Sequence, residues 1–465
     1  MKKNKQAQKH RSLLRFMEMH PAPLVAFSFV VVIISGTFCL MLPAATQSGN
    51  INLIDALFTA SSAVCVTGLV VVDTGTFFST FGHCVILALM QIGGLGVMTV
   101  SVMLFRAIGR NVTFRQRMVL QNIFAHTPRE DILHVLKTII GFTFLAEACG
   151  FIFFYLHWSS EFPPTKAAFF AIFHAVSAFC NAGFSLFPDS MVRYSSDLLL
   201  NLTMCGLIVM GGIGFPVVHD FYQKIRIGRT KRIKLTMQTK TVLLTTIILI
   251  IAGAGVYWFL EYGHSLAGKS VSESFLVSLF QSITCRTAGF NSTDISSLNP
   301  STLTLMLGLM FFGASPGSCG GGVKTTTLAL IVFFTWSRIR SKRRVNISNK
   351  SIPAETVSRS LSLTLVAASL ISVILFLILA GDTVTGTHPS VGGEMFLPYL
   401  FETVSAFGTV GLSMGVTPTL SAWGKLLIVL LMLIGRVGVL TFSYIIIGGG
   451  IANGIEYSEE NIMIG

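Results

Sequence analysis

Four short glycine-bearing phrases recur along the chain, and their residue types can coordinate a dehydrated cation. The four glycines are separated by 115, 106 and 122 residues. Glycine accepts positive φ and lets the backbone approach closely, so a loop around it can turn carbonyl oxygens toward an ion in place of water. The predicted ion-binding residues are Val66, Thr67 and Gly68; Asn181, Ala182 and Gly183; Thr287, Ala288 and Gly289; and Thr409, Val410 and Gly411.

A short apolar stretch precedes each phrase, near 53–64, 167–179, 274–285 and 396–407. About a dozen residues cannot cross a ~30 Å hydrocarbon core as a helix. Such a segment can enter the membrane as a half-helix and turn back, provided that protein or a wet cavity surrounds it. The partially negative C-terminal end of each half-helix would then favour a cation.

A second glycine pattern follows in the next apolar segment. It holds Gly93 and Gly96 in one copy, Gly211 and Gly214 in another, and reads Gly435-Arg436-Val437-Gly438 near the C-terminus. For the first two copies we favour packing between helices, because small residues let helices approach closely.

The composition of the 465-residue chain indicates a polytopic membrane protein. Hydrophobic residues make up 52% and charged residues only 11%, against roughly 25% charged in a soluble protein, and the mean hydropathy is +0.73. These values exclude a soluble enzyme, a disordered protein and a nucleic-acid-binding domain as first interpretations.

Eight long apolar segments are predicted to span the membrane, so the fold class is all-α. They lie near 22–42, 82–105, 135–157, 198–218, 241–260, 303–335, 361–380 and 425–447. With the half-helices they form four units of span, pore half-helix, filter loop and span, at 22–110, 132–222, 240–338 and 360–448. Units of one orientation are related by an axis along the membrane normal, which predicts a pseudo-fourfold arrangement around one pore.

The basic residues agree with this topology. Of the 33 Lys and Arg residues, 26 lie in 1–21, 106–137, 224–240 and 338–359, which all fall on one side of the eight-span arrangement. By the positive-inside rule this side is cytoplasmic, together with the N-terminal segment 1–21 and the C-terminal tail 449–465. The location expected is the cell membrane, in contact with the lipid bilayer and with no nucleic acid.

Two features break the rules for membrane helices. Residues 313–322 carry five glycines and one proline inside the third unit's last span, and a broken helix at membrane depth is tolerated only beside a cavity. Arg436 lies in an otherwise apolar span, where an arginine must face protein or water. It either pairs with a carbonyl or an acid to hold the bundle, or faces the pore.

Three further charged residues are predicted to support the filter. Arg286 precedes the third phrase and Glu402 lies in the fourth half-helix, where both suit hydrogen bonds to filter loops. Lys324 follows three glycines, but Val323 separates it from them, which departs from the nucleotide-binding P-loop pattern. We expect Lys324 to pair with a carboxylate or to cap carbonyl groups.

At these residues the sequence resembles the Trk and Ktr potassium transporters, over roughly residues 20 to 450. Thr409-Val410-Gly411 is similar to part of a potassium-channel filter, and Gly68 keeps the glycine that some sodium-favouring plant members replace with serine. The resemblance implies potassium bound at Gly68, Gly183, Gly289 and Gly411. With a single span before its first half-helix, the chain resembles Ktr-type more than Trk-type subunits.

The resemblance also implies a gate and partners. In the family, the stretch that matches 313–322 obstructs the pore, which assigns gating to Gly313, Ser315, Pro316, Gly317, Gly320, Gly321 and Gly322. The arginine that matches Arg436 lies beneath the filter and contributes to gating, and we favour this role for Arg436. Family members form homodimers and bind a cytosolic ring of nucleotide-binding regulatory subunits. No cofactor is implied besides the transported potassium, and modulation by sodium stays open.

The main alternative is a sodium- or proton-coupled potassium symporter of the same fold. Coupled carriers bury acids in mid-span to bind the coupling ion, and Glu147 is the exception in an interior that holds few acids. Channel-like flux is therefore preferred. A membrane enzyme is not expected, because no catalytic motif was found.

Overall fold

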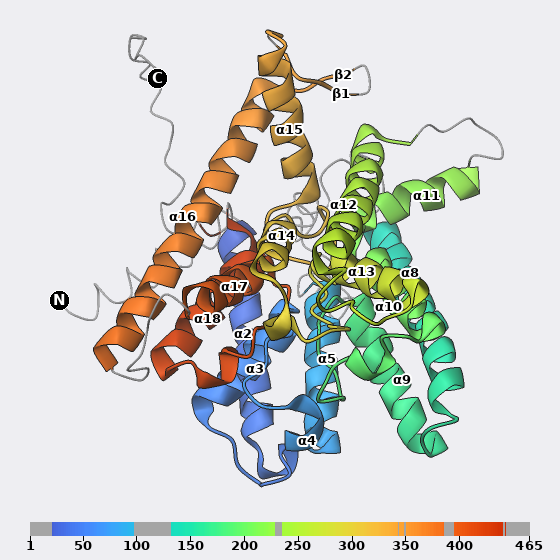
Figure 1. Ribbon diagram of the computed structural model, residues 1–465, viewed down its shortest axis with the longest axis vertical. Coiled ribbons are helices and arrows are strands. Elements are labelled where there is room, and N and C mark those ends of the chain that lie inside the picture. The colour runs from blue at the N-terminus through green and yellow to red at the C-terminus, as the bar shows by residue number, and fades with distance from the viewer. Residues whose placement is uncertain are drawn as a thin grey trace.

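The protein is mostly helical and is described by a computed structural model over residues 21–96, 132–227, 235–342, 344–347, 350–385, 395–439 and 442. The predicted segments 1–20, 97–110 and 443–465 lie outside these residues. Figure 1 shows a bundle of long outer helices around several shorter ones.

The first two predicted units each contain a long helix, a short helix and a further helix in this order. The first contains α2 (Pro21–Met41), η1 (Pro43–Ala45), α3 (Leu53–Cys65), α4 (Thr74–Phe77) and α5 (Thr80–Leu95). The second contains α8 (Ile132–Trp158), α9 (Pro164–Phe179), η2 (Val192–Tyr194), α10 (Leu198–Gly212) and α11 (Phe215–Ile227).

The last two units follow the same order. The third contains α12 (Met237–Glu261), α13 (Val271–Thr284), η3 (Ile295–Ser297), α14 (Pro300–Phe311) and α15 (Thr325–Ile339). The fourth contains α16 (Ala354–Thr385), α17 (Phe396–Gly408), η5 (Thr417–Thr419) and α18 (Ala422–Val437). A two-stranded antiparallel hairpin, β1 (Asn346–Ile347) and β2 (Lys350–Ser351), joins α15 to α16 and was not expected in an all-α fold.

Within the described residues, three helices are long and apolar enough to cross a membrane: Leu136–Trp158, Met237–Glu261 and Ala354–Gly381. The pair Leu198–Gly212 and Phe215–Ile225 would make a fourth span, but the two helices meet at 93°, and in Figure 1 α11 leaves the bundle sideways. The prediction of one continuous helix over 198–218 is therefore wrong. Gly214 has φ +96°, and Pro216 removes an amide donor, which suits the first turn of a new helix.

Contacts between helices link each unit to the next in a closed cycle. The short helices α3, α9, α13 and α17 pack against helices of their own units. Between units, α5 packs on α9, α10 on α13, α14 on α17, and α18 on α3. The second outer helix of each unit thus holds the short helix of its neighbour, and the last unit returns to the first.

Side-chain caps fix where several of the outer helices begin. Ser79 accepts a hydrogen bond from the Gly82 amide at the start of α5, Asp197 from Leu200 at the start of α10, and Ser421 from Gly424 at the start of α18. Each cap satisfies a helix-end amide that would otherwise lack a partner.

Candidate functional site

Each short helix ends in a backbone turn that side chains rarely adopt. The residue two before each predicted glycine has positive φ: Val66 (58°), Asn181 (57°), Thr287 (74°) and Thr409 (50°). For β-branched residues, which three of these are, positive φ is a genuine outlier, and it costs on the order of 1–3 kcal/mol. The same strained turn in all four copies means that the surrounding structure holds these backbones in place.

The four glycines lie against one another in a closed ring. Their φ angles are 91°, 71°, 81° and 92° for Gly68, Gly183, Gly289 and Gly411. A β-carbon on Gly68 would lie 2.6 Å from the Ala182 carbonyl oxygen, one on Gly183 2.9 Å from that of Ala288, one on Gly289 2.4 Å from that of Val410, and one on Gly411 2.0 Å from that of Thr67. Each glycine therefore leaves room for the carbonyl of the next segment.

Hydrogen bonds tie the amides of these segments back to their own helices. The amide before each glycine donates to a carbonyl one turn earlier: Thr67 to Ser62 (2.8 Å), Ala182 to Ser177 (2.7 Å), Ala288 to Thr284 (2.9 Å) and Val410 to Ser405 (2.8 Å). Since a trans peptide points its N–H and C=O in opposite directions, the carbonyl groups of the same peptides, those of Val66, Asn181, Thr287 and Thr409, point away from these helical acceptors.

Four hydroxyl groups, which the sequence analysis did not single out, brace the same turns. Ser62 accepts from the Gly68 amide at 3.1 Å and Ser405 from that of Gly411 at 3.0 Å. Ser177 donates to Phe184 at 2.8 Å and Thr284 to Phe290 at 2.6 Å. A regularity in the sequence could have revealed three of them, because serine stands six residues before the glycine in three of the four phrases.

A cavity of about 170 Å³ adjoins the glycine ring. All four glycines line it, together with residues that follow them, including Asp73 and Asp294. Both carboxylates also cap short helices: Asp73 accepts from the Thr76 amide at 2.7 Å and Asp294 from the Ser296 amide at 3.0 Å. The cavity thus brings two acidic side chains to the side of the ring where the segments continue past the glycines.

The interrupted stretch 313–322 contacts the opposite ends of the segments. A β-carbon on Gly320 would lie 2.1 Å from the Thr287 hydroxyl oxygen, and the Gly321 amide donates to the Thr409 hydroxyl at 2.8 Å. Since both threonines precede their glycines, this loop lies on the side of the ring away from the cavity.

Backbone hydrogen bonds fasten this loop to two other units. Its amides donate from Ser315 to Gly212 (3.1 Å), from Cys319 to Gly211 (3.2 Å) and from Gly322 to Gly435 (3.2 Å). Its carbonyl at Gly317 accepts from the Phe215 amide at 2.9 Å. The loop is therefore bonded on both sides of the bend between α10 and α11.

Two cations bind the same loop. Arg436 donates to the carbonyl oxygens of Cys319 and Gly93, which is the carbonyl-pairing arrangement of the two that were expected. Lys324 donates to the carbonyls of Gly320 (2.7 Å) and Gly321 (3.1 Å), and so caps carbonyls.

Glu402 and Arg286, the other two charged residues predicted to support the filter, form hydrogen bonds with different parts of the protein. Glu402 accepts from Ser413 and, at 3.0 Å, from Thr417, and so connects α17 to the chain just after the fourth glycine. Arg286 was expected to hydrogen-bond a filter loop, but it donates to Thr246 of α12 at 3.2 Å. That prediction is wrong, because the side chain leaves the turn and anchors the end of α13 to the first helix of its own unit.

Comparison with known proteins decides the family. The family described as "TrkH: Cation transport protein" matches residues 1–447. The chain belongs to this family.

Several relatives of this TrkH-family protein match it along almost its whole length. It is 36% identical to Ktr system potassium uptake protein B of Vibrio alginolyticus, over 95% of this chain and 94% of that protein. It is equally similar to the protein of the same name from Bacillus subtilis, and 35% identical to the potassium/sodium uptake protein NtpJ of Enterococcus hirae, over 96% of this chain and 98% of NtpJ.

A solved structure has the same fold. The crystal structure of the potassium transporter TrkH from Vibrio parahaemolyticus superimposes with a TM-score of 0.71, covers 91% of this chain and 84% of its own, and is 19% identical in sequence.

In this TrkH-family protein the second glycine pattern has two roles. A β-carbon on Gly93, Gly211 or Gly435 would lie 2.1, 1.8 or 2.0 Å from a carbonyl oxygen near the end of a short helix, so these glycines permit close packing, as predicted for the first two. Gly96 and Gly214 were also assigned to packing. Instead they have φ of 85° and 96° and follow helices that end there, and Gly214 in addition approaches Pro316.

Proposed function

We propose that this protein takes up potassium across the cell membrane through a channel-like pore, with the four glycine segments as its selectivity filter. The observation that carries the proposal is the ring in which every glycine leaves room for a carbonyl group of the next segment. Carbonyl oxygens arranged in a ring replace the hydration shell of a cation. The four units then surround one axis, with the basic loops and both termini in the cytoplasm.

Potassium is proposed as the ion for two reasons. Two of the relatives reported above are named as potassium uptake proteins, and the sequence keeps Gly68 and the Thr409-Val410-Gly411 phrase. We further propose a homodimer bound to a cytosolic nucleotide-binding regulatory ring.

The filter is tested by potassium, rubidium and sodium flux into liposomes that contain the purified protein. We expect fast uptake of potassium and rubidium, and loss of selectivity in Gly68→Ser, whose added side chain would meet backbone atoms 2.6 Å away. Gly49→Ser is the matched control, since Gly49 also has positive φ (81°), but a β-carbon added there would meet no atom of another described residue within 4 Å. Unchanged selectivity in Gly68→Ser would contradict the filter, and flux that requires a sodium or proton gradient would favour the coupled symporter.

We propose that the loop 313–322 is the gate, held closed by Arg436 and moved by the regulatory ring. Its bonds to Thr409, Gly435 and Gly211 support this role, because the loop crosses the side of the ring away from the cavity. Deleting 313–322 should raise potassium flux in the liposome assay without the regulatory ring. Flux equal to that of the parent protein would show that the loop is a static kink.

A further inference from the structure

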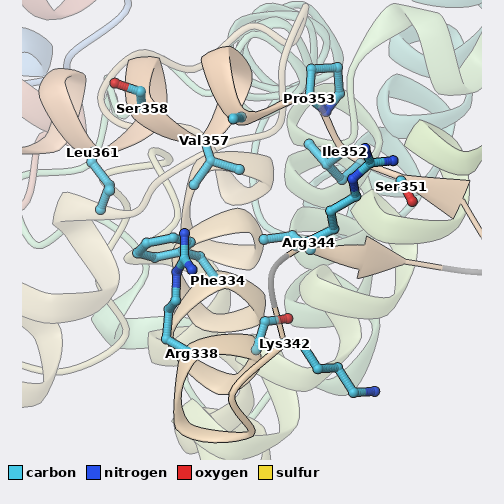
Figure 2. A pocket seen from close by; sticks show the side chains of 13 residues that line it. Phe334, Arg338, Lys342, Arg344, Ser351, Ile352, Pro353, Val357, Ser358 and Leu361 are labelled. Carbon is cyan, nitrogen blue, oxygen red and sulfur yellow. The ribbon is translucent and has the colours of Figure 1, made fainter. Parts of the chain in front are cut away.

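A hollow of about 720 Å³ lies outside the proposed pore, between the end of α15, the β1–β2 hairpin and the start of α16. Figure 2 shows it from close by. We call it the hairpin hollow. Its lining includes Phe334, Arg338, Lys342, Arg344, Val357 and Leu361.

The walls of the hairpin hollow are packed firmly. Val345, Ile347 and Val357 form a small buried cluster of their own, against which Phe334 and Leu361 pack. The Ile352 amide donates to the Val345 carbonyl at 2.9 Å and closes the hairpin. The hollow is therefore a regular part of the fold, since several of the residues that line it are packed in one buried hydrophobic cluster.

The cations that surround the hollow have no carboxylate partner among the described residues, and Arg338 lies over the Phe334 ring at 5.1 Å. Arg338, Lys342 and Arg344 have no ion pair with any carboxylate of the described residues, and the nearby Glu355 is paired with Arg359 at 2.6 Å. In Figure 2, Arg338 lies against Phe334, Arg344 rises beside Ile352, and Lys342 extends outward at the rim. Two guanidinium groups thus stand on different walls of one hollow and favour an anion between them.

The hollow lies where a lipid headgroup would be. The 32 residues of α16 make a helix of about 48 Å at ~1.5 Å per residue, which exceeds the ~30 Å hydrocarbon core. Its first turns, which line the hollow, carry the ion pair Glu355–Arg359, and because charged side chains are costly in hydrocarbon, this end is placed at the membrane surface. Val357 and Leu361 form an apolar wall of the hollow and lie near the start of the apolar span Ala354–Gly381 of that helix.

We propose that the hairpin hollow binds an anionic phospholipid, with the headgroup phosphate between Arg338 and Arg344 and an acyl chain along the wall of Val357 and Leu361. Guanidinium groups bind phosphate through paired hydrogen bonds, and basic pockets between membrane helices on the cytoplasmic side bind anionic headgroups. The inference rests on the proposed orientation, in which the basic hairpin is cytoplasmic.

The test uses the purified full-length protein and native mass spectrometry with phosphatidylglycerol and phosphatidylcholine. We expect retention of phosphatidylglycerol but not phosphatidylcholine, and at least about tenfold weaker retention in the double variant Arg338→Gln/Arg344→Gln. Arg340→Gln/Lys350→Gln removes the same charge at the end of α15 and in β2, at residues that do not line the hollow, and should retain lipid as the parent does. Ser358→Trp fills the hollow without changing charge, and should also lose the lipid.

Three results would overturn the proposal: unchanged phosphatidylglycerol retention in Arg338→Gln/Arg344→Gln, equal loss in the two double variants, or equal retention of the two lipids. Retained lipid with lost binding of a cytosolic regulatory protein in Arg338→Gln/Arg344→Gln would assign the hollow to a protein contact instead. Lipid retention is read without ion flux, so a failure of the proposed transport function would be seen separately.

Discussion

Ser61 and Ser62 are neighbours in α3, and both are fully buried, but their hydroxyl groups differ in their hydrogen bonds. Ser62 accepts from the Gly68 amide at 3.1 Å, whereas the Ser61 hydroxyl has no hydrogen-bond partner among the residues that the structure describes. One hydroxyl therefore fixes the turn that carries Thr67 and Gly68, and the other contributes nothing to it.

This difference gives a prediction for two adjacent alanine substitutions. Ser62→Ala leaves the buried Gly68 amide unpaired, which costs about 1–3 kcal/mol, so it should lower both the melting temperature and the potassium-to-sodium flux ratio. Ser61→Ala removes a buried hydroxyl that has no partner and should be neutral or stabilising. Melting curves in detergent and liposome flux measure both effects. Equal behaviour of the two variants would show that the hydroxyl of Ser62 does not fix the filter turn.

At the scale of elements, α10 shows how closely an outer helix approaches a half-helix. A β-carbon on Gly211 would lie 1.8 Å from the Phe179 carbonyl oxygen at the end of α9, while one on Gly206 would meet no atom of another described residue within 4 Å outside the backbone of its own helix. Of these two glycines of α10, one is therefore in close contact with the neighbouring helix and the other has open space beside it. The close approach at Gly211 keeps the end of α9 at its place beneath the glycine ring.

The two glycines of α10 should respond oppositely to alanine. Gly211→Ala must push α9 and α10 apart, because backbone atoms cannot yield, and overpacking of this kind costs about 1–3 kcal/mol. Gly206→Ala should stabilise the helix by about 0.5–1 kcal/mol. Thermal unfolding of the two variants in the same detergent provides the measurement, and a Gly211→Ala protein as stable as the parent would refute the packing role.

At the scale of the whole molecule, the orientation in the membrane can be measured from two exposed serines. Ser48 lies in the loop after α2, and Ser341 lies beside the basic hairpin. If the basic loops are cytoplasmic, a membrane-impermeant maleimide should label Ser48→Cys in intact cells and Ser341→Cys only in inverted vesicles. The parent protein, which keeps its native cysteines, gives the background, and the reverse pattern of labelling would invert the proposed topology.

The features that the sequence predicts are those that depend on neighbouring residues, whereas contacts between distant residues are not predicted. The short helices, the glycine turns and the break at 313–322 were predictable because each depends on local length and on glycine or proline. The hydrogen-bond acceptor of Arg286 was not predictable, since Thr246 is 40 residues away and many other hydroxyl groups of the chain could have accepted the same hydrogen bond. The bend after α10 could not be predicted, because Gly214 and Pro216 lie within one continuous apolar segment of the sequence. The hairpin at 346–351 could not be predicted either, because strands of two residues are too short to show an alternating pattern.

The contact of the last unit with the first constrains the order in which the protein can fold during its synthesis. Gly411 lies beside the Thr67 carbonyl, Lys425 pairs with Asp55 across 370 residues, and Arg436 reaches Gly93 across 343. While a ribosome is still synthesising the fourth unit, Asp55 has no Lys425 and the carbonyl of Thr67 has no neighbouring glycine segment. Because such distant contacts form only after the entropy of closing a long loop has been lost, the ring is completed last. A nascent chain of this protein therefore stays open along one side until almost all of its residues have entered the membrane.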